Sequence, residues 1–172
     1  AGHARGANLI FFDADIQLPV NYLSGIATAC VRGGVFLTTY FDFDMQFFMD
    51  RCIKVIFNLG TWISLHIGAE VAVGGNIVIK KEVFDHVHGF DESIRYAEDY
   101  SFTQKVIESG FALTVLASPR IRFSLRRYHR EGYVRVLFKQ FLATCHLFMW
   151  GPIRSEIFEY KMGGKHYDTL GK

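Results

Sequence analysis

The sequence predicts an α/β fold, in which helices pack against a β-sheet. Three observations support this: short apolar, β-rich runs alternate with segments of helical periodicity, glycines end most of these segments, and half of the 172 residues are apolar. That apolar share is enough to bury a core, and we find no internal repeat and no proline-rich linker. The length suggests one domain, or the larger part of one.

The elements of the first half follow in order. The apolar run Asn8–Phe12 predicts a strand. After it, Pro19 fits the first turn of a helix that extends to about Val31. Residues Val35–Tyr40 then predict a strand, and from Asp42 to Leu59 apolar residues recur at helical spacing until Gly60. This second helix is unusually aromatic on its apolar side.

The second half continues the alternation. Val71–Ile79 is rich in β-formers, and Lys80–Val87 predicts a short helix. A stronger helix begins near Glu98 and ends at Gly110, and Ala112–Ala117 follows as a strand. The succession of strands and helices therefore continues across most of the chain.

The last third differs, because Tyr133–Trp150 predicts one apolar helix interrupted by Arg135, Lys139 and Gln140. Its aromatic residues beside cations suit a helix in the interface of a bilayer, and packing on the core explains it equally well. The longest apolar stretches, Val55–Ala69 and Gln140–Ile153, both fall short of the ~20 residues that a membrane-spanning helix needs.

Composition excludes some classes of function. A net charge of +2 is too mild to indicate a nucleic-acid partner. The three cysteines form no CxxC pair, so neither a zinc site nor a disulfide framework is indicated, and a reducing, cytoplasmic setting is the default. The cations are unevenly placed, however, and six arginines lie between Arg120 and Arg135. This cluster predicts a local anion site.

The tripeptide Asp13-Ala14-Asp15 comes directly after the first predicted strand. Residues i and i+2 of a strand point the same way, so both carboxylates are expected in the crevice where open α/β sheets bind ligands. Mg²⁺ and Mn²⁺ prefer one or two carboxylates together with phosphate oxygens. An equally open interpretation is that both residues are solvated turn residues that cap the next helix.

A second acidic pair, Glu98-Asp99, stands where a helix is predicted to begin. The positive end of the helix stabilises an anionic carboxylate, which is then available to accept a proton. Simple N-capping is the competing interpretation, although Phe102 occupies the position where a capping-box partner would stand.

Two further motifs are weaker. Gly74-Gly75-Asn76 allows close approach of a ligand to the backbone, and its Asn can both donate and accept hydrogen bonds, yet a bulge or a tight turn explains it equally well. Arg126 and Arg127 offer donors matched to phosphate and His129 offers an imidazole, whereas a charged run is usually a solvated surface.

The order of these motifs resembles the inverting family 2 glycosyltransferases of GT-A fold. The residues that carry the resemblance are Ala7–Asp15, Gly74-Gly75-Asn76, Phe84, Gly89-Phe90-Asp91-Glu92 and Glu98-Asp99. Each motif occurs by chance, but their succession over about 90 residues seldom should. The resemblance implies a GT-A-like (Rossmann-like) mixed sheet flanked by helices. It also implies transfer of a sugar from a nucleotide-diphosphate sugar to an acceptor hydroxyl, with inversion and with Mg²⁺ or Mn²⁺.

The resemblance also assigns the acidic residues. Asp15 would be the main protein ligand of the metal, and Asp13 would face the ribose or the metal. Asp99 would be the general base that deprotonates the acceptor, with Glu98 as its neighbour. His129 would be an additional metal ligand.

The remaining roles concern the substrates. Gly75 and Asn76 would line the donor-sugar pocket, and Arg126 and Arg127 would meet the leaving diphosphate. Trp62 is a candidate for binding the acceptor, which we expect to be a carbohydrate or a lipid-linked molecule.

The chain departs from the family pattern in two ways. The βαβ elements that hold the nucleotide base should precede Asp13 and are missing. We therefore expect residues 1–130 to be a partial GT-A domain, residues 131–172 to be an amphipathic helix and tail, and Asn8–Phe12 to lie at an exposed sheet edge without a complete base pocket. A QxxRW motif is also missing, which favours transfer of single sugars over polymer synthesis.

Two other functions stay open at this point. A DxD motif also occurs in haloacid-dehalogenase-like phosphatases, but Ile16-Gln17 stands where they have Gly-Thr or similar. Alternatively, the chain is catalytically silent and binds a membrane or a partner. For the transferase we expect a cytoplasmic location, peripheral on the membrane, and no nucleic-acid partner.

Overall fold

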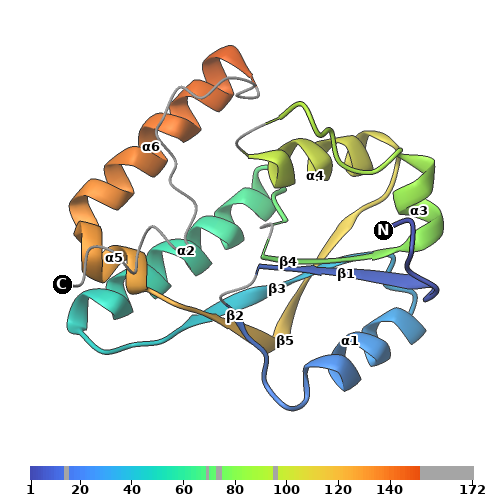
Figure 1. Cartoon of the computed structure of the whole chain (residues 1–172), viewed down its shortest axis with the longest axis horizontal. Helices are drawn as coiled ribbons and strands as arrows, with labels where there is room; N and C mark the ends of the chain where they lie inside the picture. Colours follow the sequence, from blue (N-terminus) through green and yellow to red (C-terminus); the bar gives the residue numbers. More distant parts are fainter. Residues whose placement is uncertain (14–15, 69, 73–74, 95–96, 152–172) are drawn as a thin grey trace.

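The structure is a computed structural model that describes residues 1–13, 16–68, 70–72, 75–94 and 97–151. Within these ranges a mixed five-stranded sheet is flanked by helices, with α1 on one side and α3 and α4 on the other (Figure 1). The strands are β1 (Asn8–Phe12), β2 (Ile16–Gln17), β3 (Phe36–Phe43), β4 (Asn76–Lys80) and β5 (Leu113–Phe123). The helices are α1 (Tyr22–Val31), α2 (Phe48–His66), α3 (Lys81–His86), α4 (Glu98–Glu108), α5 (Arg126–Glu131) and α6 (Tyr133–Trp150).

The strand order is β1-β4-β3-β5-β2. Only β3 and β5 pair in parallel, and the other three pairings are antiparallel. Strand β1 thus lies at one edge of the described sheet, which confirms the expectation for Asn8–Phe12. Strand β2 lies at the opposite edge.

Residues 13–15 are all that separates β1 from β2. In a flat sheet the two edges would be four strand spacings apart, about 19 Å at about 4.8 Å each. The four residue steps from Phe12 to Ile16 reach at most about 14 Å. The sheet must therefore curl at this end, so that the ends of β1 and β5 approach each other.

Two apolar clusters fill the two faces of the sheet. Phe36, Ile77 and Ile79 belong to the cluster beneath α3 and α4, together with Phe102 and Val106. Leu37 and Val78, their neighbours in the chain, belong to the other cluster. Because successive residues of a strand point to opposite faces, this division follows from the pleat of β3 and β4.

The second cluster joins α1 to the three helices at the other end of the sheet. Its buried members outside β3–β5 are Tyr22, Ile26, Ile53, Leu125, Tyr128 and Val136. Helix α6 therefore packs one face on the core, which agrees with one of the two interpretations of this helix.

Strand β3 is longer than predicted, because Asp42 and Phe43 belong to it and not to the following helix. Both residues pair with β5, in register with Arg122 and Phe123. Strand β5 also continues to Phe123, past an irregularity of the pairing in which Pro119 lies. A proline cannot donate to a ladder and is tolerated at such a bulge.

Other element ends also differ from the prediction. Helix α2 continues to His66, because Gly60 weakens a helix without ending it. Strand β4 begins at Asn76 rather than Val71. The short elements β2 and α5 were not predicted, since two and six residues are too few to show a period.

None of the helices in the described ranges has both the length and the apolarity to cross a membrane.

Candidate active site

The carboxylate of Asp13 lies against Gly75. Strand β1 pairs Phe12 with Asn76 in antiparallel register, so the residue after Phe12 lies beside the residue before Asn76. A Cβ atom on Gly75 would stand 3.0 Å from Oδ2 of Asp13 and 2.6 Å from Cε1 of Phe123. Glycine thus allows this close approach, and a larger residue would displace the ring of Phe123 or the carboxylate of Asp13. The predictions for Asp15 and Gly74 fall outside the described residues.

Glu98 and Asp99 begin α4, as predicted. The residue before them, Ala97, adopts a left-handed conformation with φ 58° and has no side chain that caps the helix. Desolvation raises the pKa of Glu98, a hydrogen bond from its own backbone N–H partly offsets this, and the charges of Asp99 and Asp13 raise it further. The carboxylates of Asp13, Glu98 and Asp99 therefore share one electrostatic neighbourhood.

Buried Thr103 fixes the first turn of α4 next to the segment that leads into β4. Its hydroxyl donates to the carbonyl oxygen of Asp99 at 2.7 Å and accepts from the N–H of Ala72 at 3.1 Å. Gln104 adds a second tie, because its side-chain N–H donates to the carbonyl oxygen of Glu70 at 2.8 Å. The first turn of α4, which holds Asp99, is thus tied to residues 70 and 72.

Asn76 is fully buried, and its amide group is bonded inside the protein. Its Oδ1 accepts from the hydroxyl of Tyr22, and its Nδ2 donates to Oγ1 of Thr39 at 2.7 Å. The backbone carbonyl of Asn76 also accepts from the hydroxyl of Thr38 at 2.8 Å. The amide therefore faces the protein interior, and its effect on a ligand would pass through Gly75 and Asp13.

The two predicted phosphate-binding arginines, Arg126 and Arg127, begin α5. They follow three and four residues after Phe123, whose ring lies against Gly75. Three residues of chain span at most about 11 Å. The curl of the sheet thus brings these cations to the same end of the fold as Asp13.

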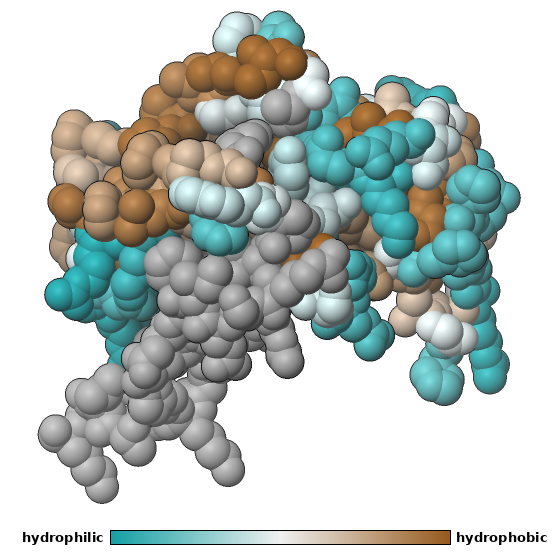
Figure 2. All heavy atoms as spheres, turned by 90° about the horizontal axis from the view of Figure 1, so that it is seen from above, coloured by the Kyte–Doolittle hydropathy of each residue, from teal (hydrophilic) through white to brown (hydrophobic). Residues whose placement is uncertain are grey.

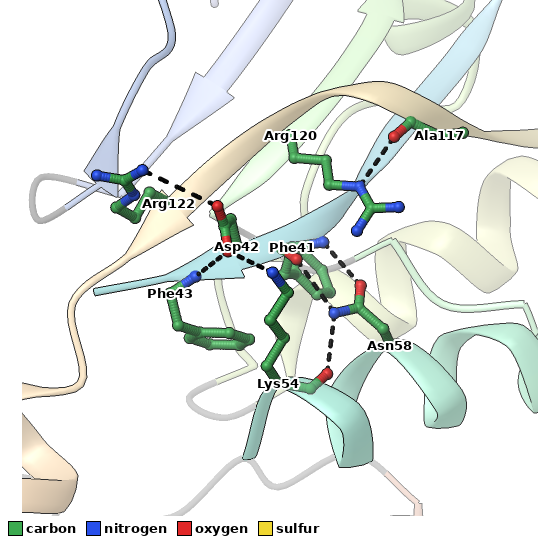
Figure 3. Close-up of polar contacts among 8 residues, drawn as sticks. All are labelled: Phe41, Asp42, Phe43, Lys54, Asn58, Ala117, Arg120 and Arg122. Carbon is green, nitrogen blue, oxygen red and sulfur yellow. Dashed lines mark hydrogen bonds and ion pairs between the residues drawn. The ribbon is translucent and has the colours of Figure 1, made fainter. Parts of the chain in front are cut away.

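A second charged cluster holds the junction of β3, β5 and α2 (Figure 3). Nζ of Lys54 lies 2.7 Å from Oδ1 of Asp42, and Nη2 of Arg122 lies 3.9 Å from Oδ2. Partial burial would raise the pKa of Asp42, but the Lys54 ammonium, the N–H of Phe43 and Arg122 together hold it below its usual value. Arg122 also pairs with Gln17 of β2. This cluster therefore supports the strand that follows residues 13–15.

Asn58 joins α2 to the end of β3 in the same region (Figure 3). Its side chain accepts from the N–H of Phe41 at 2.9 Å and donates to the carbonyl oxygen of Phe41 at 3.1 Å. Its amide thereby bonds to the backbone of β3 as a neighbouring strand would, next to the irregularity in the pairing of β3 with β5. The helix and the strand end are locked together.

His129 contacts the fully buried carboxylate of Asp50. Its Nε2 lies 2.9 Å from Oδ1 of Asp50, and the hydroxyl of Tyr133 donates to the same oxygen at 2.7 Å. Oδ2 of Asp50 accepts from the N–H groups of Gln46 and Phe47 at 2.7 and 2.8 Å. One carboxylate thus joins α2, α5 and α6, and the predicted metal ligation by His129 would be left to its other ring nitrogen.

The hydrogen bonds of this network set its ionisation. Burial alone would raise the pKa of Asp50, but the bonds from His129, Tyr133, Phe47 and Gln46 outweigh it and hold the pKa well below its usual range. Burial and the contact with Asp50 raise the pKa of Tyr133 to about 12. Asp50 is therefore a buried anion throughout the neutral range.

Trp62, the candidate for acceptor binding, lies on α2 and is 49% exposed. Its ring is stacked at an angle on His66, with centroids 4.0 Å apart. Two open depressions of about 580 and 530 Å³ lie elsewhere, along α1. Neither is lined by Trp62 or by the predicted acidic residues.

The donor set fits a hard divalent cation that also binds substrate phosphates. Among the described residues no group of three or more His, Cys, Asp or Glu side chains is arranged to hold a metal ion. A Mg²⁺ or Mn²⁺ ion that also binds substrate phosphates needs only one or two protein carboxylates. Asp13, beside two further carboxylates, meets that smaller requirement.

A comparison with families of known proteins identifies the chain. The family described as glycosyl transferase family 21 matches residues 1–137. The chain belongs to glycosyl transferase family 21. No curated protein matches it. The resemblance to a glycosyltransferase is thus confirmed, with family 21 where we expected family 2, and the activity class is glycosyl transfer.

Sequence reasoning missed three residues that support the candidate site through buried or charged contacts: Tyr22, Asp42 and Asp50. One signal was present for Asp50, since it falls at helical spacing with Ile53 and Phe57 on the apolar side of α2. A charged residue on a core-facing stripe indicates a buried, fully bonded group. For Asp42 and Tyr22 the partners come from distant parts of the chain, and no local pattern reveals them.

We expect Gly75→Ala to lower the free energy of unfolding by about 1–3 kcal/mol, because the new methyl group would overlap the packed ring of Phe123. Gly60→Ala is the matched control, since a Cβ at that position meets nothing within 4 Å. It should stabilise α2 by about 0.5–1 kcal/mol. Urea unfolding curves of both variants test this, and equal midpoints would refute the close approach.

Lowering the pH should lower the free energy of unfolding through the protonation of Asp50. Its folded-state pKa is lowered, so its contribution is complete above the unfolded pKa of about 4 and is lost as the pH falls below that value. Asp50→Asn should cost about 3 kcal/mol at pH 7 and should flatten the dependence of stability on pH between about 4 and 2. Thermal melts followed by circular dichroism measure this.

Asp85→Asn is the control for that experiment, because Asp85 is an exposed residue paired with Lys81. This variant should keep the full acid sensitivity of the unmodified protein. An Asp50→Asn protein with the same sensitivity would show that another group governs acid unfolding.

Proposed function

We propose that this chain catalyses transfer of a single sugar from a nucleotide-diphosphate sugar to an acceptor hydroxyl, with inversion and with Mg²⁺ or Mn²⁺. The observation that carries the proposal is the shared neighbourhood of Asp13, Glu98 and Asp99, in which the charges of both aspartates add to the increase that desolvation gives the pKa of Glu98. Membership of family 21 supports glycosyl transfer, and the two acidic motifs supply residues suited to donor and acceptor.

Asp99 is the general base of this proposal. It lies in the first turn of α4, where the partial positive charge of the helix favours its ionised form. The acceptor oxygen attacks the anomeric carbon in line, the bond from that carbon to the diphosphate oxygen breaks, and Asp99 takes the acceptor proton. A single displacement inverts the anomeric centre.

Arg126 and Arg127 stabilise the departing nucleoside diphosphate in this proposal. Guanidinium groups match phosphate geometry, and α5 follows directly from the strand end that lies against Gly75. Asp13, with Asp15, would hold the divalent ion, which supplies further positive charge to the diphosphate when bound. Glu98 contributes to the negative field that makes a cation favourable here.

The experiment is a donor screen that measures released nucleoside diphosphate in the presence of Mn²⁺. We expect Asp99→Asn to lower kcat by about 10²–10⁴-fold, because it removes the base and keeps the shape. Binding of the donor should change little. Asp85→Asn, an exposed carboxylate on α3, is the control and should keep full turnover.

Other outcomes of the screen decide between the alternatives. Full turnover by Asp99→Asn would overturn the base assignment. No turnover with any nucleotide sugar, together with no donor binding, would favour the catalytically silent module.

We also propose that the protein is cytoplasmic and contacts a membrane surface through α6. Apolar surface gathers over this helix in Figure 2. Most of the exposed apolar side chains that the structure describes on α6 fall on one side of it at helical spacing, and Trp150 at its end lies off this side. The residues of this stripe are Val134, Phe138, Phe141, Leu142 and Met149. The cations Arg135 and Lys139 lie beside this stripe, a distribution typical of helices in a bilayer interface. A lipid-linked acceptor would be reached from such a position.

Sedimentation with phospholipid vesicles tests the membrane contact. We expect the double variant Phe138→Ser and Phe141→Ser to weaken vesicle binding about tenfold or more, because both rings leave the stripe. The control replaces Val20 and Val31, which are 107% and 89% exposed outside α6, with Ser. Equal loss in both proteins, or vesicle binding by neither the variants nor the unmodified chain, would refute this contact.

A further inference from the structure

We propose that Tyr22 and Asn76 are positioning residues that hold Asp13 at the metal site. The inference rests on the proposed function, because it assumes that Asp13 serves a divalent cation. It differs from the expected role of Asn76 as a residue that touches the donor sugar. The contacts of three buried polar side chains carry it.

The first contact joins the start of α1 to the C-terminal end of β1 and to Asn76, its partner on β4. Tyr22 is the first residue of α1, and its hydroxyl donates to Oδ1 of Asn76. The ring of Tyr22 also meets the ring of Phe12 edge-on, with centroids 5.4 Å apart. Tyr22 therefore ties the start of α1 to Phe12, the last residue of β1, and to Asn76, the first residue of β4.

The second contact fixes Asn76 itself. Phe12 of β1 pairs with Asn76, and Nδ2 of Asn76 donates to Oγ1 of Thr39 at 2.7 Å. Thr39 and Asn76 are both fully buried, so neither side chain has water as an alternative partner. The amide of Asn76 is thus oriented by two partners, one on β3 and one on α1.

The position of Asp13 follows from these ties. Asp13 comes directly after Phe12 and lies against Gly75, the residue before Asn76. Since only residues 13–15 connect β1 to β2, a shift of the last residue of β1 moves the carboxylate of Asp13, which follows it directly. A network that joins Phe12, Asn76 and Tyr22 therefore controls where Asp13 can stand.

A role in packing alone does not explain the hydroxyl of Tyr22. Tyr22 is 1% exposed in a cluster composed mainly of apolar side chains, where phenylalanine would avoid the cost of burying a polar group. Burial raises the pKa of the Tyr22 phenol, so the hydroxyl remains a donor at neutral pH. The hydrogen bond to Asn76 is what the hydroxyl adds.

The test compares two Tyr→Phe variants of the same core cluster. Tyr22→Phe removes the buried bond to Asn76, whereas Tyr128→Phe removes a part-buried bond from the Tyr128 hydroxyl to Oε1 of Gln140 at 2.9 Å. The probe is Mn²⁺ together with uridine or guanosine diphosphate, whose phosphates complete the coordination of the ion, and protein-bound Mn²⁺ is measured by equilibrium dialysis. Thermal melts of both variants report their stability.

We expect Tyr22→Phe to raise the Kd for Mn²⁺ about fivefold or more, and Tyr128→Phe to change it less than about twofold, at similar losses of Tm. Thr39→Val should act like Tyr22→Phe, because it leaves Nδ2 of Asn76 without its acceptor. Thr39→Ser, which keeps the hydroxyl, should restore the affinity of the unmodified chain.

Two results would overturn the inference, and they differ in what they say about the proposed function. If the unmodified chain binds Mn²⁺ and Tyr22→Phe binds it equally well, the positioning role fails and the metal site stands. If the unmodified chain binds no Mn²⁺, the metal-dependent part of the proposed function fails, and the positioning role fails with it.

Discussion

The short crossing from β1 to β2 is the constraint on which the candidate site depends. The two strands lie at opposite edges of the sheet, yet only residues 13–15 connect them. The curl that this connection requires brings Phe123 of β5 over Gly75 at the start of β4. Asp13 at the end of one edge strand and Arg126 and Arg127 after another strand therefore lie at the same end of the molecule, although some 110 residues of sequence separate them.

Buried polar groups do the work of holding these parts in place, and each joins two or more elements. Asp50 links three helices, Thr103 links α4 to the approach of Gly75, and Asn76 links α1, β3 and β1. A polar group inside a protein is costly unless all its partners are present, so such networks favour one arrangement of the elements over nearby alternatives. Apolar contacts alone would tolerate small shifts between the same helices and strands.

The parts that could be predicted from the sequence are those with a strong local pattern. Strand β1 and helix α6 have the predicted ends, because an acidic turn and flanking glycines delimit them, and α4 begins at Glu98 as expected. Asp42 was assigned to a helix because the pairing that extends β3 comes from residues 121–123, which no local period reveals. The interior position of Asn76 was missed for the same reason, since its partners lie 37 and 54 residues away.

Asn58 has a consequence for the order in which the chain can assemble. Its amide closes a contact between β3 and α2 that spans only 17 residues, whereas β3 and β5 meet across more than 70. Loops of that shorter size close at a smaller entropic cost, and contacts near in sequence favour rapid folding. We therefore expect β3 and α2 to pair early in folding, and the end of the fold that holds Asp13 and Gly75 to be completed only when β5 joins the sheet.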